Sequence, residues 1–432
     1  MGADVPARSS GQLDRGRLAR REHALARRGS GDRSARGRAP ATGRCPAGDA
    51  VRGEAAVRHA LRWDTAARYG PLALVGAALL FALLYVLVIS QPLGEFGVGS
   101  WRTTTRGSAV DNPGAFLTTL LDSITFAGWL FIVASGFSLI FGLMRVVNMA
   151  HGSFYLLGGY IAYEIQQAMT GQGFAIPSND VNTWEWVLPL LVAAGSIMVV
   201  GLVTQQLLLR WNMGQDLRQA LITIAVSVIV ADQIIAHFPR AVPSGAVKFG
   251  GNVVSMTWPG WTDRLLDLHL WGAHYSLARF FMLALGVACG LALWLWLYRT
   301  KTGMIIRAGV DDRQMTAALG VNIQVTFAIA FVVGSALAAF GAVVGASQSG
   351  VGQGQDVQWL LNSLVVVIVG GMGSLVGAAA GALLYALVLT FSAAYLPVSG
   401  NNCCSQYSIV LTFALIALVL AFRPQGLFGR AG

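Results

Sequence analysis

The stretch RVVNMAHGSFYLLGGYIAYE, residues 145–164, decides how this chain folds, because it places polar residues inside a sequence that is otherwise apolar enough for a membrane. Asn148, His151, Gly152 and Ser153 stand where a membrane helix would begin. Backbone that leaves the helix at membrane depth is tolerated only where protein or a water-filled cavity satisfies its amides. The stretch therefore predicts a broken membrane helix, capped by Asn148, whose polar start faces an internal pathway.

The composition is that of an integral membrane protein. Of the 432 residues, 55% are hydrophobic and only 12% are charged, whereas soluble domains carry about a quarter charged residues. The four cysteines include one adjacent pair, Cys403 and Cys404, and form neither a disulfide framework nor a metal-binding spacing. We expect no metal and no cofactor.

The net charge of +10 is concentrated at the N-terminus. Residues 1–68 hold 15 of the 30 basic residues and 7 of the 20 acidic residues, so they supply +8. This Arg-, Ala- and Gly-rich segment has no apolar periodicity and cannot bury a core. It predicts a disordered basic cytoplasmic tail, and because the charge is not spread over a folded surface, nucleic-acid binding is not expected.

Apolar runs predict an all-α polytopic fold with about eight to ten membrane helices. Runs of spanning length, about 20 residues, lie near 71–90, 117–143, 186–209, 217–238, 276–298, 325–347, 375–396 and 407–422, and two interrupted runs lie at 153–168 and 359–371. Counting all ten as crossings places nine basic residues in the inner loops and six in the longer outer loops, which satisfies the positive-inside rule. Residues 69–114 are then the first span with its outer loop, and 115–432 the main membrane domain.

A second interruption occurs in GGMGSLVGAAAGALL, residues 370–384. Its predicted pathway residues are Gly370, Gly371, Gly373 and Ser374, of which Ser374 can cap the next helix. Gly373, Gly377 and Gly381 recur every four residues, so Gly377 and Gly381 predict close packing against another helix. Paired interruptions in the two halves of a membrane protein indicate a transporter's translocation region, although packing alone also explains the glycines.

The longest polar stretch on the predicted cytoplasmic side after the tail is RTKTGMIIRAGVDDRQMTAALGVNIQ, residues 299–324. Its features predict a short helix across the inner face: a start at Asp311 and Asp312, an apolar edge at Met315, Ala318 and Leu319, and an end at Gly320. Such a helix fits either a solvated surface without a partner or a docking site for a partner protein.

Several kinds of chemistry lack their sequence signature. The chain has no H-E-x-x-H pattern and no phosphate-binding loop, since its two lysines follow Val247 and Thr300 rather than glycine. It is therefore predicted to be a transport protein, not an enzyme. Asp122 and Asp232 lie near the outer ends of apolar runs, and His151 has no visible catalytic partner; packing explains this histidine better than catalysis. An ion-coupled secondary transporter stays the alternative. Whether uptake depends on a proton gradient or on ATP would distinguish it from an ATP-driven transporter.

Four motifs together resemble the membrane permeases of bacterial ABC importers for branched-chain amino acids: IFGLMRVVNMAHGSFYLLGGYIA (140–162), RTKTGMIIRAGVDDRQMTAALGVN (299–322), VVVIVGGMGSLVGAAAGALL (365–384) and FRPQGLFGR (422–430). The similarity covers roughly residues 115–430. It implies an inner-membrane importer with two permease subunits, identical or homologous, two cytoplasmic ATP-binding subunits and an extracytoplasmic substrate-binding protein. It also implies that 308–320 is the coupling helix, with Ala317 among its contact residues. Leucine, isoleucine or valine are the implied substrates, but similar permeases carry other small solutes.

Overall fold

The computed structural model describes residues 113–144, 147–170, 181–212, 214–237, 253–268 and 273–395, with short pieces between 410 and 428. The predicted tail (1–68) and almost all of the first span and outer loop (69–114) lie outside the described residues, and so does most of the predicted span at 407–422.

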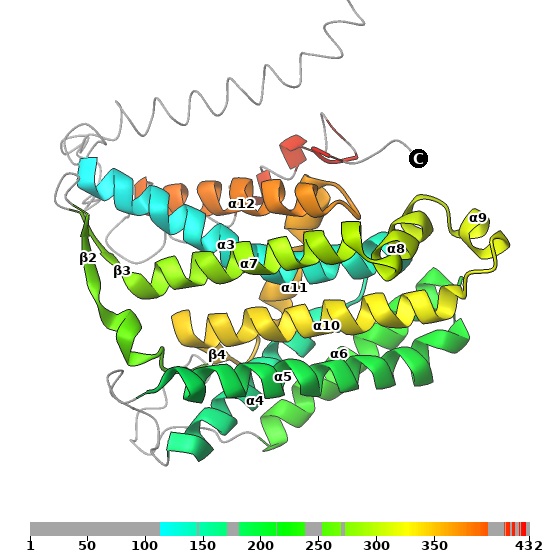
Figure 1. The fold of residues 1–432 in the computed structure, drawn as a ribbon, viewed down its shortest axis with the longest axis horizontal. Coiled ribbons are helices and arrows are strands. Elements are labelled where there is room, and N and C mark those ends of the chain that lie inside the picture. Colours follow the sequence, from blue (N-terminus) through cyan, green and yellow to red (C-terminus); the bar gives the residue numbers. More distant parts are fainter. Residues whose placement is uncertain are drawn as a thin grey trace, which may run out of the picture. The chain divides into compact units, whose positions relative to one another are not determined.

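The described chain is a helix bundle (Figure 1), as the apolar runs predict. Its long helices are α3 (Pro113–Met144), α4 (His151–Thr170), α5 (Thr183–Val203), α6 (Asp216–His237), α7 (Leu277–Arg299), α10 (Ile323–Gln348), α11 (Gln355–Gly370) and α12 (Leu375–Tyr395). Six of them, α3, α5, α6, α7, α10 and α12, are long and apolar enough to cross a membrane. The all-α polytopic prediction is therefore confirmed.

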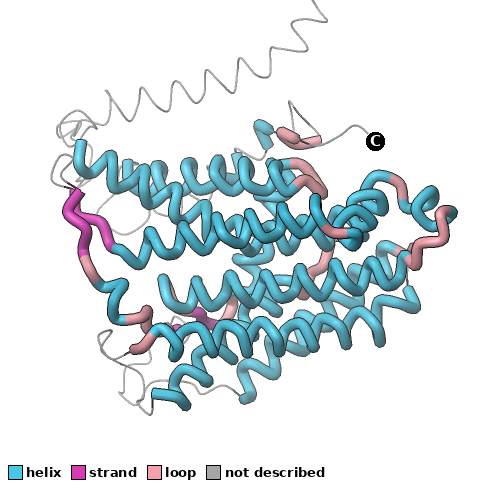
Figure 2. Tube along the Cα trace, in the orientation of Figure 1, coloured by secondary structure: helices cyan, strands magenta, loops and turns pink. Residues whose placement is uncertain are grey.

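Short elements occupy the two ends of the bundle (Figure 2). At one end lie β2 (Leu265–Leu268) and β3 (Ala273–Ser276), which pair antiparallel, the 3-10 helix η6 (Gly260–Asp263), and β1 (Val253–Val254), which pairs with β4 (Val351–Gly352). At the other end lie α8 (Lys301–Asp311) and α9 (Arg313–Ala318), and α5 ends there in a π-helix, η4 (Thr204–Leu209), and a 3-10 turn, η5 (Arg210–Asn212). We call these the hairpin end and the α8–α9 end.

Two helices form the centre of the bundle. The most apolar windows of α3 and α10 are 78% and 72% buried, against 17% for α6 and 22% for α7, so the other helices pack around this pair. Gly136 and Gly334 face each other where α3 and α10 cross, and a Cβ on either glycine would overlap the other's backbone. Glycine here permits the close backbone approach that membrane helices use in place of a hydrophobic driving force.

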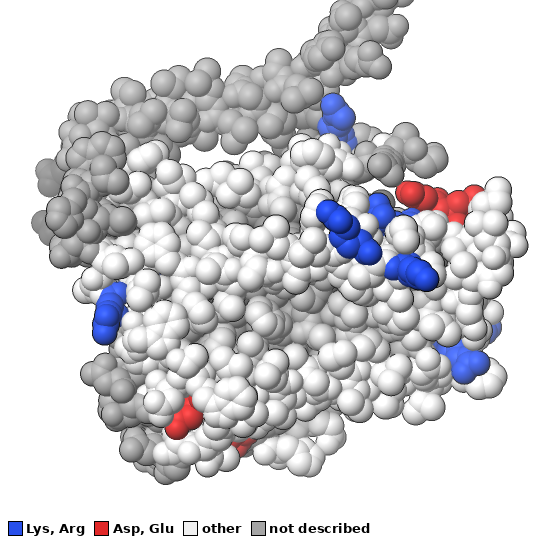
Figure 3. Space-filling view, in the orientation of Figure 1, with Lys and Arg blue, Asp and Glu red and all other residues white. Residues whose placement is uncertain are grey.

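Basic side chains gather at the α8–α9 end, while the visible side of the bundle carries few charges (Figure 3). Exposed basic residues at this end are Arg210, Arg218, Arg299 and Lys301. A charge-free belt between charged ends is the pattern of a chain that lies across a bilayer.

The glycine spacing of α12 gives a first test. A Cβ on Gly381 would overlap the carbonyl oxygen of Val366 in α11, and backbone atoms cannot move aside as side chains can. We expect Gly381→Ala to lower the melting temperature of the purified chain in detergent.

Gly195→Ala in α5 is the matched control, because nothing lies within 4 Å of that position and alanine has the higher helix propensity. Equal melting temperatures for the two variants would contradict close α11–α12 packing.

Candidate functional site: two helix starts at the middle of the membrane

The start of α4 is built from the polar residues that interrupt the sequence. The side-chain oxygen of Asn148 accepts a hydrogen bond from the backbone N–H of Ala150 (3.1 Å), and the backbone N–H of Met149 donates to the hydroxyl of Thr223 in α6 (3.2 Å). Asn148 is buried, like His151, Gly152 and Ser153. The cap satisfies an amide that the first turn of a helix otherwise leaves unpaired.

This helix start lies deep in the bundle. Nε2 of His151 is 3.1 Å from the carbonyl oxygen of Val133, and its ring packs edge-on against Phe137. Val133 is eleven residues from the last residue of α3, or about 16 Å at 1.5 Å per residue. The chain therefore turns back after α3 and begins α4 near half the thickness of a bilayer, about 30 Å.

The start of α11 lies at the same depth. Trp359, in its second turn, packs against Trp129 with ring centroids 4.4 Å apart, and Trp129 is midway along α3, between Pro113 and Met144. A Cβ on Gly152 would overlap the backbone carbonyl oxygen of Asp356. The N-termini of α4 and α11 therefore abut, and from there α4 runs toward the hairpin end and α11 toward the α8–α9 end.

A small polar cluster marks this junction. The hydroxyl of Ser153 is 2.7 Å from the hydroxyl of Ser227 in α6 and 3.5 Å from a carboxylate oxygen of Asp356. Ser227 stands at the centre of α6, eleven residues from Asp216 and ten from His237, so the cluster is about 15 Å from either end of that helix. The carboxylate of Asp356 therefore lies at the middle of the membrane.

Sequence analysis missed Asp356. It follows GVGQGQ, residues 350–355, which reads as a polar loop outside the bilayer, whereas the structure folds this loop back into the bundle. The available signal was the short apolar run at 359–371, because a span of that length must begin at mid-depth if its other end reaches the surface.

The second predicted interruption is not part of this junction. Gly370 ends α11, Gly371 and Gly373 have φ of 109° and 75°, and the hydroxyl of Ser374 caps α12 by accepting from the N–H of Gly377 (3.0 Å). Gly373 lies against Gly142, near the end of α3, and Val310 of α8. The four residues thus form a turn at the α8–α9 end, a full helix length away from Asn148–Ser153.

The C-terminal motif explains why this turn is rich in glycine. The N–H groups of Leu427 and Phe428 donate to the carbonyl oxygens of Val369 and Gly370, both at 2.9 Å, and a Cβ on Gly426 would lie 2.6 Å from the amide nitrogen of Gly371. The motif FRPQGLFGR therefore caps the carbonyls at the end of α11, groups that a helix cannot pair by itself.

The predicted coupling segment forms two helices rather than one. Asp312 separates α8 from α9 and caps α9, its carboxylate accepting from the N–H of Met315 (3.0 Å), so residues 308–311 belong to α8 and the single helix expected over 308–320 is wrong. Gly320 ends the segment with φ of 83°. The exposed members of the predicted surface are Asp311, Asp312, Met315, Ala317, Ala318, Leu319 and Gly320.

Known proteins share this sequence over most of its length. Residues 119–420 match the family described as branched-chain amino acid transport system / permease component. The chain belongs to this family. It is a permease of the ABC-transporter type, and the resemblance drawn from the four motifs is confirmed.

Individual relatives have low sequence identity to this chain, but the match covers nearly their whole length. The high-affinity branched-chain amino acid transport system permease protein BraD of Pseudomonas aeruginosa is 28% identical over 73% of this chain and 96% of its own length. LivH of Salmonella typhimurium, a permease protein of the same description, is 25% identical over the same shares. A chain of PsaBC from Streptococcus pneumoniae in complex with Fab aligns over 70% of this permease and 89% of its own length at 12% identity, with a TM-score of 0.37, too low for comparison.

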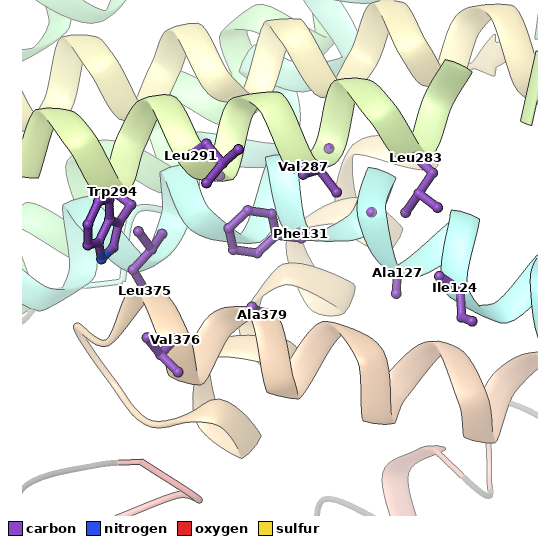
Figure 4. A pocket seen from close by; sticks show the side chains of 13 residues that line it. Ile124, Ala127, Phe131, Leu283, Val287, Leu291, Trp294, Leu375, Val376 and Ala379 are labelled. Atoms are coloured by element: carbon purple, nitrogen blue, oxygen red, sulfur yellow. The ribbon is translucent and has the colours of Figure 1, made fainter. Parts of the chain in front are cut away.

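A lateral hollow of about 430 Å³ between α3, α7 and α12 of the permease has a different character (Figure 4). Its lining is apolar and rich in small residues: Ile124, Ala127, Gly128, Phe131, Leu283, Gly286, Val287, Gly290, Leu291, Trp294, Leu375, Val376 and Ala379. A polar solute finds no hydrogen-bonding side chain there apart from one indole, so we do not place the pathway in it.

The two carboxylates singled out from the sequence lie elsewhere. Asp122 forms an ion pair with Arg279 of α7, which connects α3 and α7 near the hairpin end. Asp232 is exposed on α6, five residues before its end. Neither contacts the junction at Asp356.

The contact between the starts of α4 and α11 can be tested by adding one methyl group. Gly152→Ala would push the start of α4 away from the carbonyl of Asp356, so we expect a large loss of transport together with a lower melting temperature. Gly195→Ala in α5 is the control, because nothing lies within 4 Å of that position. Normal uptake by Gly152→Ala would contradict direct contact between the two helix starts.

Proposed function

We propose that this chain is the membrane subunit of an ATP-driven importer of branched-chain amino acids in a bacterial cytoplasmic membrane. Membership of the permease family carries the proposal, since its named relatives transport these amino acids. The absence of a phosphate-binding loop from the sequence supports a subunit that takes its energy from a separate ATP-binding protein.

The ATP-binding subunits would dock at the α8–α9 end. The positive-inside rule assigns the end with exposed Arg210, Arg218, Arg299 and Lys301 to the cytoplasm. There Met315 and Leu319 expose 61% and 78% of their surface. Large apolar side chains so exposed beyond the membrane belt indicate a partner surface. A substrate-binding protein would then approach the hairpin end, and a second permease subunit, identical or homologous, would complete the pathway.

The contacts of α8 suggest how docking of the ATP-binding subunits would affect the pathway. Val310 of α8 touches Gly373 in the turn that follows α11, and the opposite end of α11 carries Asp356 at the junction with α4. We propose that α11 transmits a displacement of α8 and α9 to the middle of the membrane as a rigid helix. Gly370, Gly371, Gly373 and Ser374 then serve as the hinge between coupling and pathway, and Asn148–Ser153 line the pathway.

Docking is tested by a charge on the exposed apolar edge. Leu319→Glu would place an unpaired carboxylate in the buried contact, a change that typically costs several kcal/mol, so the ATP-binding subunit should no longer co-purify with the permease. Gln215→Glu is the control, since Gln215 is exposed just before α6 and lies outside α8 and α9. Equal recovery of the ATP-binding subunit with both variants would place the docking surface elsewhere.

The energy source is tested with the assembled importer in liposomes. Uptake of leucine should require ATP on the α8–α9 side and should persist when a proton ionophore removes the pH gradient. The purified permease alone should show no ATP hydrolysis. Uptake that follows the proton gradient and ignores ATP would establish the ion-coupled alternative.

A further inference from the structure

Asp356 has no cationic partner within the described chain. The residue is only 8% exposed, and the one hydrogen-bond contact described for its side chain is with the hydroxyl of Ser153 at 3.5 Å, which is at the limit of a hydrogen bond. No described Lys, Arg or His lies within 4 Å of it, whereas Asp122, closer to the membrane surface, is paired with Arg279.

A carboxylate at this depth requires a counter-charge. Ionised groups inside a membrane are costly and pair with one another or face a water-filled cavity. Asp356 stands in the first turn of α11, next to the first turn of α4. The partial positive charge of these helix starts attracts a carboxylate, but two dipole ends replace a cation only in part.

The adjoining face of α11 is not covered by the described residues. Gln358 is exposed, and Val357 and Leu361 expose 56% and 39% of their surface, although Trp359 beside them lies at mid-membrane depth. A glutamine facing lipid at this depth leaves its amide without hydrogen bonds, which costs several kcal/mol per group. We therefore expect this face to turn toward a hydrated path or another protein segment rather than toward lipid.

The junction also holds an unpaired buried amide donor and an unpaired ring nitrogen. Nδ2 of Asn148 and Nδ1 of His151 have no hydrogen-bond partner among the described residues, and both side chains are almost fully buried. Native proteins leave few such groups unpaired. Both atoms belong to the start of α4, which abuts Asp356 through Gly152, and polar atoms from outside the described residues would satisfy them.

We propose that Asp356 is the specificity-determining residue of the pathway and binds the ammonium group of a zwitterionic amino acid at the middle of the membrane. The inference rests on the proposed function and adds to it a substrate-binding residue inside the permease. Ser153, which is itself hydrogen-bonded to Ser227, lies against the carboxylate of Asp356. The starts of α4 and α11 supply the partial positive charge that the carboxylate of the substrate faces. An ammonium ion provides the counter-charge that the described chain lacks.

Ligand binding to the purified full-length permease is the first measurement, because it needs no ATP-binding subunit. Leucine at saturating concentration should raise the melting temperature by about 2 °C or more, whereas 4-methylpentanoate, which lacks the amino group, should not. Asp356→Asn should abolish the shift, Asp356→Glu should retain part of it, and Asp232→Asn, an exposed carboxylate of α6, should leave it unchanged. An equal shift with Asp356→Asn, or with 4-methylpentanoate, would overturn the proposal.

Uptake by the assembled importer is the second measurement. Asp356→Asn should lower leucine uptake by about tenfold or more, the usual effect of removing a charged hydrogen-bonding partner, while the ATP-binding subunit still co-purifies. If instead the variant loses its second permease subunit, the carboxylate pairs with a cation of that subunit, and the proposal is wrong. Leucine binding that depends on Asp356 in a permease whose uptake ignores ATP would refute the proposed energy source and sustain this inference.

Discussion

The contact between Gly152 and the backbone of Asp356 is the constraint on which the rest of the structure depends. It brings together two helix starts at half the thickness of the bilayer, so α4 and α11 each cover only part of the membrane before the chain must turn. Each chain segment that leads to a start therefore folds back into the bundle. Such non-helical backbone can exist at that depth only because α3, α6 and α10 enclose it.

Both ends of α11 are held by contacts with other parts of the chain. One end carries Asp356 into the junction, and the other is held by the C-terminal motif through Val369 and Gly370 and touches α8 through Gly373. A helix fixed in this way moves as a unit, because its carbonyls are paired at one end and its backbone abuts α4 at the other. In the proposed coupling mechanism, a displacement of α8 and α9 would reach the middle of the membrane through α11.

The sequence predicts the membrane spans well because hydropathy depends only on composition along the chain. The expected runs at 217–238 and 325–347 differ from α6 and α10 by two residues or fewer at each end. Caps were also predictable, as Asn148, Asp312 and Ser374 show, since capping is local chemistry. The depth of a loop in the membrane could not be predicted. The polar sequence GVGQGQD fits a surface loop as well as a re-entrant loop, and only the tertiary contact of Trp359 with Trp129 shows that the loop is re-entrant. For the same reason the sequence did not show that the two interruptions lie apart by the length of α11, and their roles in the pathway stay predictions.

The most direct test of the account is the water accessibility of α11 at mid-membrane depth. In a cysteine-free chain, Gln358→Cys should react with a small charged thiol reagent, because this face of α11 borders the hydrated path. Val287→Cys, at the centre of α7 and in the apolar lateral hollow, should resist it, since the thiolate that reacts does not form in hydrocarbon. Equal resistance at both positions would mean that α11 faces lipid or dry protein, and would contradict a pathway at the junction of α4 and α11.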